Sequence, residues 1–212
     1  INFEYIMGPL SAAAIILASL SAIYQTNIKR MLAYSSIAQL GYMTLGISMA
    51  TKEGLSASIM HLTQHAFAKS ALFLALGCVI YKLGSANLDN IRGLGRRMPI
   101  TTAAIIIGGL SMVGIPLTGG FISKWYLIQA AMGADLWLYA VTIILGSILA
   151  LVYIGRIIEL AFFEGSDEQL ALGEAPMTLL TPVWLLLIAN IYLGIFPDRI
   201  ISVAQYISEG LF

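Results

Sequence analysis

Apolar residues run through this chain in long stretches that polar residues seldom interrupt, without the regular polar face of a soluble helix or strand. A helix needs about 20 mostly apolar residues to cross the hydrocarbon core of a bilayer. Six stretches are long enough for this, and they predict membrane-spanning helices at 5–26, 31–50, 55–81, 99–133, 136–162 and 176–196. The pattern therefore predicts an all-α membrane protein of about six spans.

The fourth stretch is too long for one straight span, and helix-breaking residues interrupt it. Gly114, Pro116, Gly119 and Gly120 divide it into apolar halves, and these halves are roughly 15 and 13 residues long. Irregular backbone at membrane depth is tolerated only where protein or a water-filled cavity surrounds it. We therefore expect a discontinuous membrane helix. Two buried core helices of a soluble protein are the alternative, which the spanning length of the neighbouring stretches disfavours.

Composition supports the membrane class. The chain is 59% hydrophobic and 10% charged, with a mean hydropathy of +0.88, whereas about a quarter of the residues of a soluble domain are charged. Eleven basic and eleven acidic residues leave no basic face for nucleic acid, so nucleic-acid binding is excluded. Cys78 is the single cysteine, which excludes disulfides within the chain and cysteine-based metal sites. No cofactor pattern is present, so we expect no bound cofactor.

Basic residues between the spans predict the orientation, because cytoplasmic loops carry the excess of lysine and arginine. Seven of them fall in the regions after spans 1, 3 and 5: Lys29, Arg30, Lys82, Arg92, Arg96, Arg97 and Arg156. Only Lys52 and Arg199 fall on the opposite side. We therefore expect both ends of the chain outside the cell, in a multi-pass protein of the cell (inner) membrane. The acidic segment Glu164–Glu174 says little about orientation.

We expect a single membrane domain over residues 1–212. Its part 5–133 holds the polar axis and the broken helix, and its part 134–212 holds the last two spans and an amphipathic tail, 200–212, at the membrane interface. The chain opens with Ile1 rather than Met and shows no signal-peptide pattern. We expect it to be part of a longer subunit, or the product of a split gene.

Polar residues inside the third span point to proton transfer. His61, His65 and Lys69 recur every four residues on one helix face, beside Gln64, and they cover a rise of about 12 Å. Histidine exchanges protons near neutral pH, and a lysine removed from bulk water can do the same. A proton relay along this face is the favoured hypothesis, and an interhelical hydrogen bond is the alternative. The histidine spacing also fits a zinc pair, but no third ligand is evident, so we expect no metal.

Lys124 carries the most specific signal. It is the only charged residue between Arg97 and Asp135, and it follows the helix break by one turn. An ammonium at membrane depth costs several kcal/mol unless it faces water or protein dipoles. We therefore expect Lys124 to lie on an ion path. Arg156 and Glu159 are predicted to form a local ion pair. Lys29 either reaches the lipid headgroups or starts a hydrated face that continues through Tyr34, Ser35, Ser36 and Gln39.

Three segments together resemble a known family: NIKRMLAYSSIAQLGY at 27–42, HLTQHAFAKSALFL at 61–74 and GIPLTGGFISKW at 114–125. They are similar to the antiporter-like subunits shared by respiratory complex I, membrane-bound hydrogenases and Mrp-type sodium/proton antiporters. The resemblance runs from about Gly8 to Pro197. The sequences at 96–100 and 121–125 look most like those of the Mrp D subunit.

The resemblance implies a core of fourteen helices with two inverted repeats, each containing a broken helix with a channel residue. The present spans look like the last six of that core, without the first repeat. By the motif match, Lys124 corresponds to the channel residue of the second repeat. His61, His65 and Lys69 correspond to the polar axis before it, and Lys29 matches a lysine of the same axis.

The favoured interpretation is a proton-translocating half-channel in a subunit of a sodium/proton antiporter complex, with other membrane subunits, protons, sodium and the lipid bilayer as its partners. The alternative is a proton-pumping membrane subunit of a redox complex, either an NADH-quinone oxidoreductase or a membrane-bound hydrogenase, whose redox centres lie on other subunits. A further alternative is a structural scaffold without transport. The chain itself is expected to be no enzyme, because translocation needs no covalent chemistry.

Overall fold

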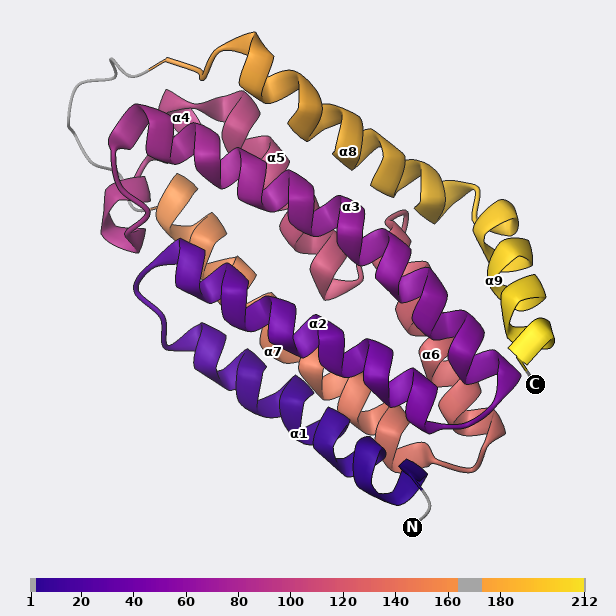
Figure 1. Ribbon diagram of the computed structural model, residues 1–212. Helices are drawn as coiled ribbons and strands as arrows, with labels where there is room; N and C mark the ends of the chain where they lie inside the picture. Colours follow the sequence, from indigo (N-terminus) through magenta and orange to yellow (C-terminus); the bar gives the residue numbers. More distant parts are fainter. Residues whose placement is uncertain (1–2, 164–172, 212) are drawn as a thin grey trace.

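The structure is a computed structural model that describes residues 3–163 and 173–211, and helices make up nearly all of this part (Figure 1). The helices are α1 (Phe3–Ile23), α2 (Ile28–Ser48), α3 (Lys52–Leu83), η1 (Leu88–Ile91), α4 (Leu94–Arg97), α5 (Pro99–Val113), α6 (Gly119–Gly133), α7 (Trp137–Phe162), α8 (Met177–Ile195) and α9 (Asp198–Leu211). The all-α prediction is confirmed, and the outer limits of the six predicted stretches agree with the helix ends to within three residues.

Four helices of the described chain are long and apolar enough to cross a membrane: α1 from Tyr5 onward, α3, α7 and α8. The second predicted span, α2, has 21 residues but is less apolar. Its polar residues include Ser35 and Gln39, which are buried inside the bundle rather than turned toward lipid. The fourth predicted span is present as two helices of 15 residues each, α5 and α6.

Helix α3 is the central element of the bundle. It packs against α2, α5, α6, α8 and α9, whereas α1 packs mainly on α2 and α7 (Figure 1). Because α3 is surrounded on several sides, its polar residues face protein rather than lipid: His61, Gln64 and Lys69 are all buried. This placement satisfies the condition for polar groups at membrane depth, since neighbouring helices can supply their hydrogen-bond partners.

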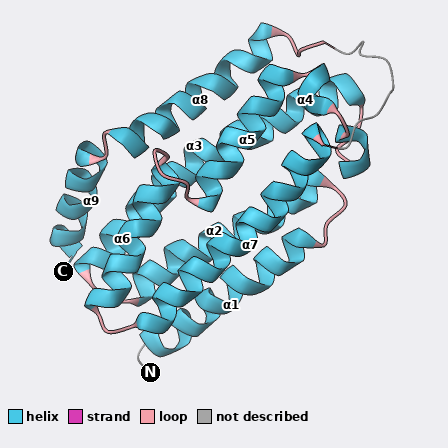
Figure 2. Cartoon of the chain, turned by 180° about the vertical axis from the view of Figure 1, so that it is seen from behind, coloured by secondary structure: helices cyan, strands magenta, loops and turns pink. Residues whose placement is uncertain are grey.

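The break between α5 and α6 lies about halfway along the bundle (Figure 2). Helix α5 ends at Val113 and is capped by Gly114, which adopts a left-handed φ of 93° that suits glycine. The amides of Gly114 and Ile115 both donate to the Leu110 carbonyl. A tight turn follows, in which the Thr118 amide donates to the Ile115 carbonyl and Pro116 takes the second position. Leu117 has φ 74° in this turn, where glycine is the preferred residue. The predicted discontinuity is therefore real and strained.

Arg156 of α7 has other partners than the sequence predicts. Arg156 does not pair with Glu159: its guanidinium donates to the carbonyls of Ile23 (3.2 Å) and Gln25 (3.3 Å), where α1 ends. That prediction was wrong because carbonyls left free at a helix end compete well for a cation. Residues 164–172 of the acidic segment lie outside the described residues.

Glu174 closes the start of α5. Its two carboxylate oxygens accept hydrogen bonds from the amides of Ile100 (2.5 Å) and Thr101 (3.3 Å), and the Thr101 hydroxyl adds a third (2.7 Å). The first amides of a helix have no partner within the helix, and a carboxylate there also interacts favourably with the helix dipole. The segment before α8 is thereby fastened to the first half of the broken helix.

The beginning of α1 and the end of α9 lie at the same end of the bundle (Figure 1). Helix α9 is amphipathic, as predicted for the tail, and it begins at Asp198. It packs on the first turns of α3, where the hydroxyls of Ser56 and Ser208 are 2.7 Å apart. The tail is thus part of the bundle as well as a candidate interfacial helix.

Candidate functional site

Lys124 lies where α2, α5, α6 and α7 meet. Its side chain is 4% exposed, and its ammonium donates to the carbonyls of Met112 (2.8 Å) and Val113 (3.2 Å) and to the Ser147 hydroxyl (2.9 Å). All three partners are neutral. A buried ammonium with several acceptors avoids most of the cost of leaving water.

The helix break creates this binding arrangement. Helix α5 stops at Val113, so the carbonyls of Met112 and Val113 lack the amide partners that a continuing helix would give them. The C-terminal end of a helix also carries partial negative charge, which favours a cation. Lys124 reaches these carbonyls from α6 because the two half-helices approach closely: a Cβ added to Gly120 would collide with the Ser111 carbonyl oxygen. The break and the lysine therefore form one unit.

Tyr42 of α2 connects Lys124 with His61. The Lys124 ammonium is 4.5 Å from the centre of the Tyr42 ring, within the range of a cation–π contact. On the other side, the His61 ring centre is 5.3 Å from that of Tyr42, with the rings tilted by 59°. Tyr42 itself is fully buried. An aromatic ring thus separates the two titratable groups and holds both in place.

Both ring nitrogens of His61 have partners. Nδ1 is 2.9 Å from the Ser123 hydroxyl of α6, and Nε2 is 3.0 Å from Oε1 of Gln39 on α2. The Ser123 hydroxyl also has the Gly120 carbonyl at 3.2 Å as an alternative acceptor. Ser123 can therefore donate to a neutral His61, or turn toward Gly120 and accept from a protonated one. The surroundings accommodate both charge states of the imidazole, as proton exchange requires.

Lys69 has a similar arrangement two turns further along α3. Its ammonium donates to the Leu32 carbonyl (2.7 Å) and to the Ser35 hydroxyl, both on α2. The side chain is 6% exposed. Lys69 and His61 are thus both held by the polar face of α2, which supplies Ser35 to one and Gln39 to the other.

His65 lies between these two residues along α3. It is half-buried, and its Nδ1 is enclosed without a hydrogen-bond partner. Enclosed polar atoms of this kind normally bond to protein or ordered water. A water molecule at His65 would satisfy Nδ1 and continue the series of polar groups between Lys69 and His61.

The structure places Lys29 apart from this cluster. Lys29 is exposed in the first turn of α2, where its amide donates to the Asn27 side chain that begins the helix. This position fits the interfacial alternative, and a hydrated connection from Lys29 stays a prediction.

Sequence reasoning missed the hydroxyl and amide groups that complete the site. Tyr42, Ser123 and Ser147 each contact His61 or Lys124, yet each stands in a mostly apolar helix with no charged neighbour beside it in the sequence except for Ser123. Asn190 of α8 is a further example, since it accepts from Ser111 (2.6 Å) and donates to Gln64. A buried Asn in an apolar span was the available signal for this last residue.

Carboxylates take no part in the cluster. Arg92 and Asp89 form an ion pair at the surface, outside the cluster. Glu159, the predicted partner of Arg156, is exposed near the end of α7. Among the described residues, the hydrogen-bond acceptors of the two buried lysines are carbonyls and hydroxyls, so no carboxylate there locks either lysine in the charged form. Both ring nitrogens of His61 have hydrogen-bond partners in the protein, so neither is free to bind zinc, and this disfavours the zinc alternative.

Comparison with known proteins adds a family and several relatives. A family model described as "NADH:quinone oxidoreductase/Mrp antiporter, TM" matches residues 1–150. The chain is 35% identical to NADH-quinone oxidoreductase subunit N of Desulforudis audaxviator, over 95% of this chain and 43% of that protein. The chain thus spans about half the length of the curated relatives it matches.

Solved structures share the fold. A chain of the Mrp complex from Dietzia sp. DQ12-45-1b superposes with a TM-score of 0.90 at 22% identity, over 97% of this chain and 47% of that one. A chain of an archaeal respiratory membrane complex, the membrane-bound sulfane sulfur reductase, gives a TM-score of 0.85 at 32% identity, over 92% of this chain and 32% of that one. The first likeness concerns the fold alone; the second adds similarity of sequence.

Proposed function

Because this chain belongs to the NADH:quinone oxidoreductase/Mrp antiporter family of multi-pass membrane subunits, we propose that it translocates protons in a redox-driven membrane complex, as a subunit of the N type. This is the second of the two functions expected from the sequence. The preference for an Mrp D subunit is given up, because curated relatives of this chain are named as subunits of NADH-quinone oxidoreductase and F(420)H(2) dehydrogenase. Sodium exchange has less support for the same reason.

The proposed path follows the polar groups of α3. A proton would pass from Lys69 through water at His65 to His61, and from there by way of Ser123 to the region of Lys124. Residues 5–133 supply the titratable groups, and Ser147 of α7 completes the ligands of Lys124. The observation that best supports this function is the position of the Lys124 ammonium. It is buried beside the break between α5 and α6, and its hydrogen-bond acceptors are all neutral.

Control of the charge on Lys124 would come from outside the described residues. A cavity of about 260 Å³ opens beside Lys124 between α6 and α7, and its lining is apolar except for Lys124 and Ser147. Another membrane subunit, or another part of the same protein, would bring a carboxylate close to the lysine there and favour its charged form. Withdrawal of that carboxylate would release the proton.

The test is Lys124→Ala in the assembled complex, reconstituted in sealed vesicles. We expect electron transfer to persist in part, and proton translocation per electron to fall. Lys124→Arg is the matched variant: it keeps a cation that hardly deprotonates, so it too should fail to translocate. Undiminished translocation in both variants would reject the assignment and leave a structural scaffold as the better description.

A further inference from the structure

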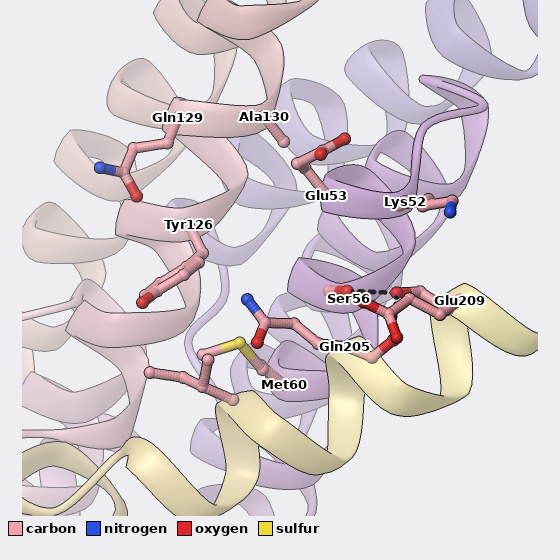
Figure 3. Close-up of a pocket in the computed structure, with 11 residues that line it drawn as sticks. Lys52, Glu53, Ser56, Met60, Tyr126, Gln129, Ala130, Gln205 and Glu209 are labelled. Carbon is pink, nitrogen blue, oxygen red and sulfur yellow. Dashed lines mark hydrogen bonds between the residues drawn. The ribbon is translucent and has the colours of Figure 1, made fainter.

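A second cavity, of about 250 Å³ and lined by several polar side chains, lies between α3, α6 and α9. Figure 3 shows Glu53 extending from α3, Tyr126 and Gln129 from α6, and Gln205 from α9 toward α6. Glu209 of α9 also lines the cavity. A space of this size holds several water molecules. Its lining includes the first turn of α3 and the last turns of α9, which lie at the same end of the bundle (Figure 1). The distribution of basic residues predicts that this end faces the outside of the cell.

The wall formed by α9 is fixed by buried contacts. Ser56 of α3 and Ser208 of α9 are 1% to 5% exposed, and their hydroxyls are 2.7 Å apart. Ser56 also lies 3.4 Å from the Ala204 carbonyl, one turn away on α9. The cavity is therefore enclosed by an element that packs specifically on α3.

A smaller cavity of about 10 Å³ lies deeper in the bundle and is lined by residues that include Gln64 and Ser123. Its volume suits about one water molecule. The two cavities share a single lining residue, Met60. Met60 is buried, and a methionine side chain is flexible enough to change position without disturbing its helix. Met60 thus borders both cavities, and the smaller one extends to Ser123, the partner of His61.

Gln64 presents an unused donor at this point. Asn190 accepts from the Ser111 hydroxyl through Oδ1, so its amide nitrogen faces Gln64 and donates to the Gln64 oxygens. This fixes the orientation of the Gln64 amide. The Gln64 Nε2 is left enclosed with no hydrogen-bond partner, in a side chain that lines the smaller cavity and is 2% exposed. An enclosed donor without a protein partner indicates a bound water molecule.

We propose that the cavity between α3, α6 and α9 is the outer vestibule of the proton path, and that it binds water and hydronium. Met60 acts as its movable plug, and Gln64 holds the water that joins the vestibule to Ser123. Glu53 and Glu209 favour cations in the vestibule, and Lys52, the one basic residue of the lining, points away from it in Figure 3. This inference rests on the proposed function, since it assigns the outer end of the same path.

Cysteine labelling in the assembled complex tests the vestibule. Gln205→Cys places a thiol in the cavity, and Ser202→Cys places one on the exposed surface of the same helix, outside the lining. Both are treated from either side of sealed vesicles with two membrane-impermeant thiosulfonates of similar size, one carrying an ammonium and the other a sulfonate. The complex with its native cysteines is the control, and the amount of assembled complex is measured for each variant.

We expect the thiol at 205 to prefer the cationic reagent by on the order of tenfold over the anionic one, because carboxylates attract cations into a confined space. Adding Glu53→Gln and Glu209→Gln should bring this ratio down to that of the thiol at 202. Modification at 205 should lower proton translocation, and modification at 202 should not. A thiol introduced by Met60→Cys should also react, more slowly.

Two results would overturn the vestibule: unchanged translocation after complete modification at 205, or no reaction at 60 with either reagent. Lys124→Ala in the same vesicles separates this failure from failure of the proposed function. Loss of translocation in Lys124→Ala, together with no effect at 205, would reject the vestibule alone. Unchanged translocation in Lys124→Ala would reject the function on which the vestibule rests.

Discussion

His61 shows how a single buried residue can be equipped for proton transfer. A protonated imidazole has two N–H donors, and His61 has an oxygen partner for each, the Gln39 amide oxygen on one nitrogen and the Ser123 hydroxyl on the other. The hydroxyl of Ser123 can act as donor or acceptor, and Gly120 gives it a second acceptor. Reorientation of this hydroxyl would accompany each proton that passes.

Ser123→Ala should therefore lower proton translocation while the complex still assembles. The change leaves the Nδ1 of a fully buried His61 without a partner, which costs about 1–3 kcal/mol. The measurement is the number of protons translocated per electron in sealed vesicles. Ser123→Thr retains the hydroxyl and is the matched control. Equal loss in both variants would show that packing around position 123 matters and the hydroxyl does not.

At the residue scale, the sequence predicted which titratable residues belong to the site, but it did not predict which side chains contact them. Lys124, His61 and Lys69 stand out in apolar surroundings, and the structure buries all three. Ser147 and Tyr42 could not be assigned to Lys124 in advance, because they belong to α7 and α2 and meet the lysine only through the packing of four helices. Serine and tyrosine are also common in membrane helices for other reasons, so their sequence signal is weak.

At the scale of elements, the break in the fourth span depends on a close approach of two backbones. Gly120 lies directly against the Ser111 carbonyl, and Gly119 lies against Asn190 and Gln64, where an added Cβ would be 3.1 Å from each. Any side chain at 120 must push α6 away from α5. Such a shift would also withdraw Lys124 from the carbonyls that hold it.

Gly120→Ala should accordingly destabilise the subunit by about 1–3 kcal/mol, as overpacking does, and should impair translocation at the same time. Gly133→Ala is the matched change in α6, because a Cβ at Gly133 meets nothing within 4 Å. Thermal unfolding of the purified complex in detergent measures the difference. If Gly120→Ala unfolds at the same temperature as Gly133→Ala, the close approach of α5 and α6 is not required.

Asn190 links three elements, since it joins α8 to Ser111 of α5 and to Gln64 of α3. Asn190→Ala leaves buried polar groups unpaired on both neighbours and should cost about 1–3 kcal/mol in the free energy of unfolding. Thr181→Ala, in the exposed part of the same helix, should change it by less than about 0.5 kcal/mol. A comparison of their denaturant unfolding curves decides this, and equal curves would assign Asn190 no structural role.

The elements themselves were largely predictable. Span limits followed from hydrophobic length, and the break followed from Gly114 and Pro116 because both disfavour a continuing helix. The short helices η1 and α4 were not predicted, since four residues give no periodic pattern. The prediction for Arg156 was wrong because it considered only a neighbour in the same helix. Its guanidinium instead donates to carbonyls at the end of α1 that lie more than 130 positions away in the sequence.

At the scale of the whole molecule, the distribution of basic residues predicts the side of the membrane on which each loop lies. Asn90→Cys, in η1 between α3 and α5, and Ser202→Cys, in α9, introduce exposed thiols at opposite ends of the bundle. An impermeant reagent should label position 202 from outside the cell and position 90 only after the membrane is opened. The reverse pattern would invert the topology and place the vestibule on the cytoplasmic side.

The buried lysines also bear on which kind of complex contains this subunit. Lys124 and Lys69 have no carboxylate partner within the described residues, so their protonation depends on groups supplied from elsewhere. A redox-driven complex would supply them in step with electron transfer. We therefore expect a complex purified through a tag on this chain to contain iron–sulfur subunits in fixed proportion, measured by iron content and electron paramagnetic resonance against an untagged control.

Purification with antiporter subunits alone, together with sodium-dependent proton exchange, would instead support the interpretation as a sodium/proton antiporter subunit. It would then be the movement of a cation, rather than of electrons, that changes the surroundings of Lys124.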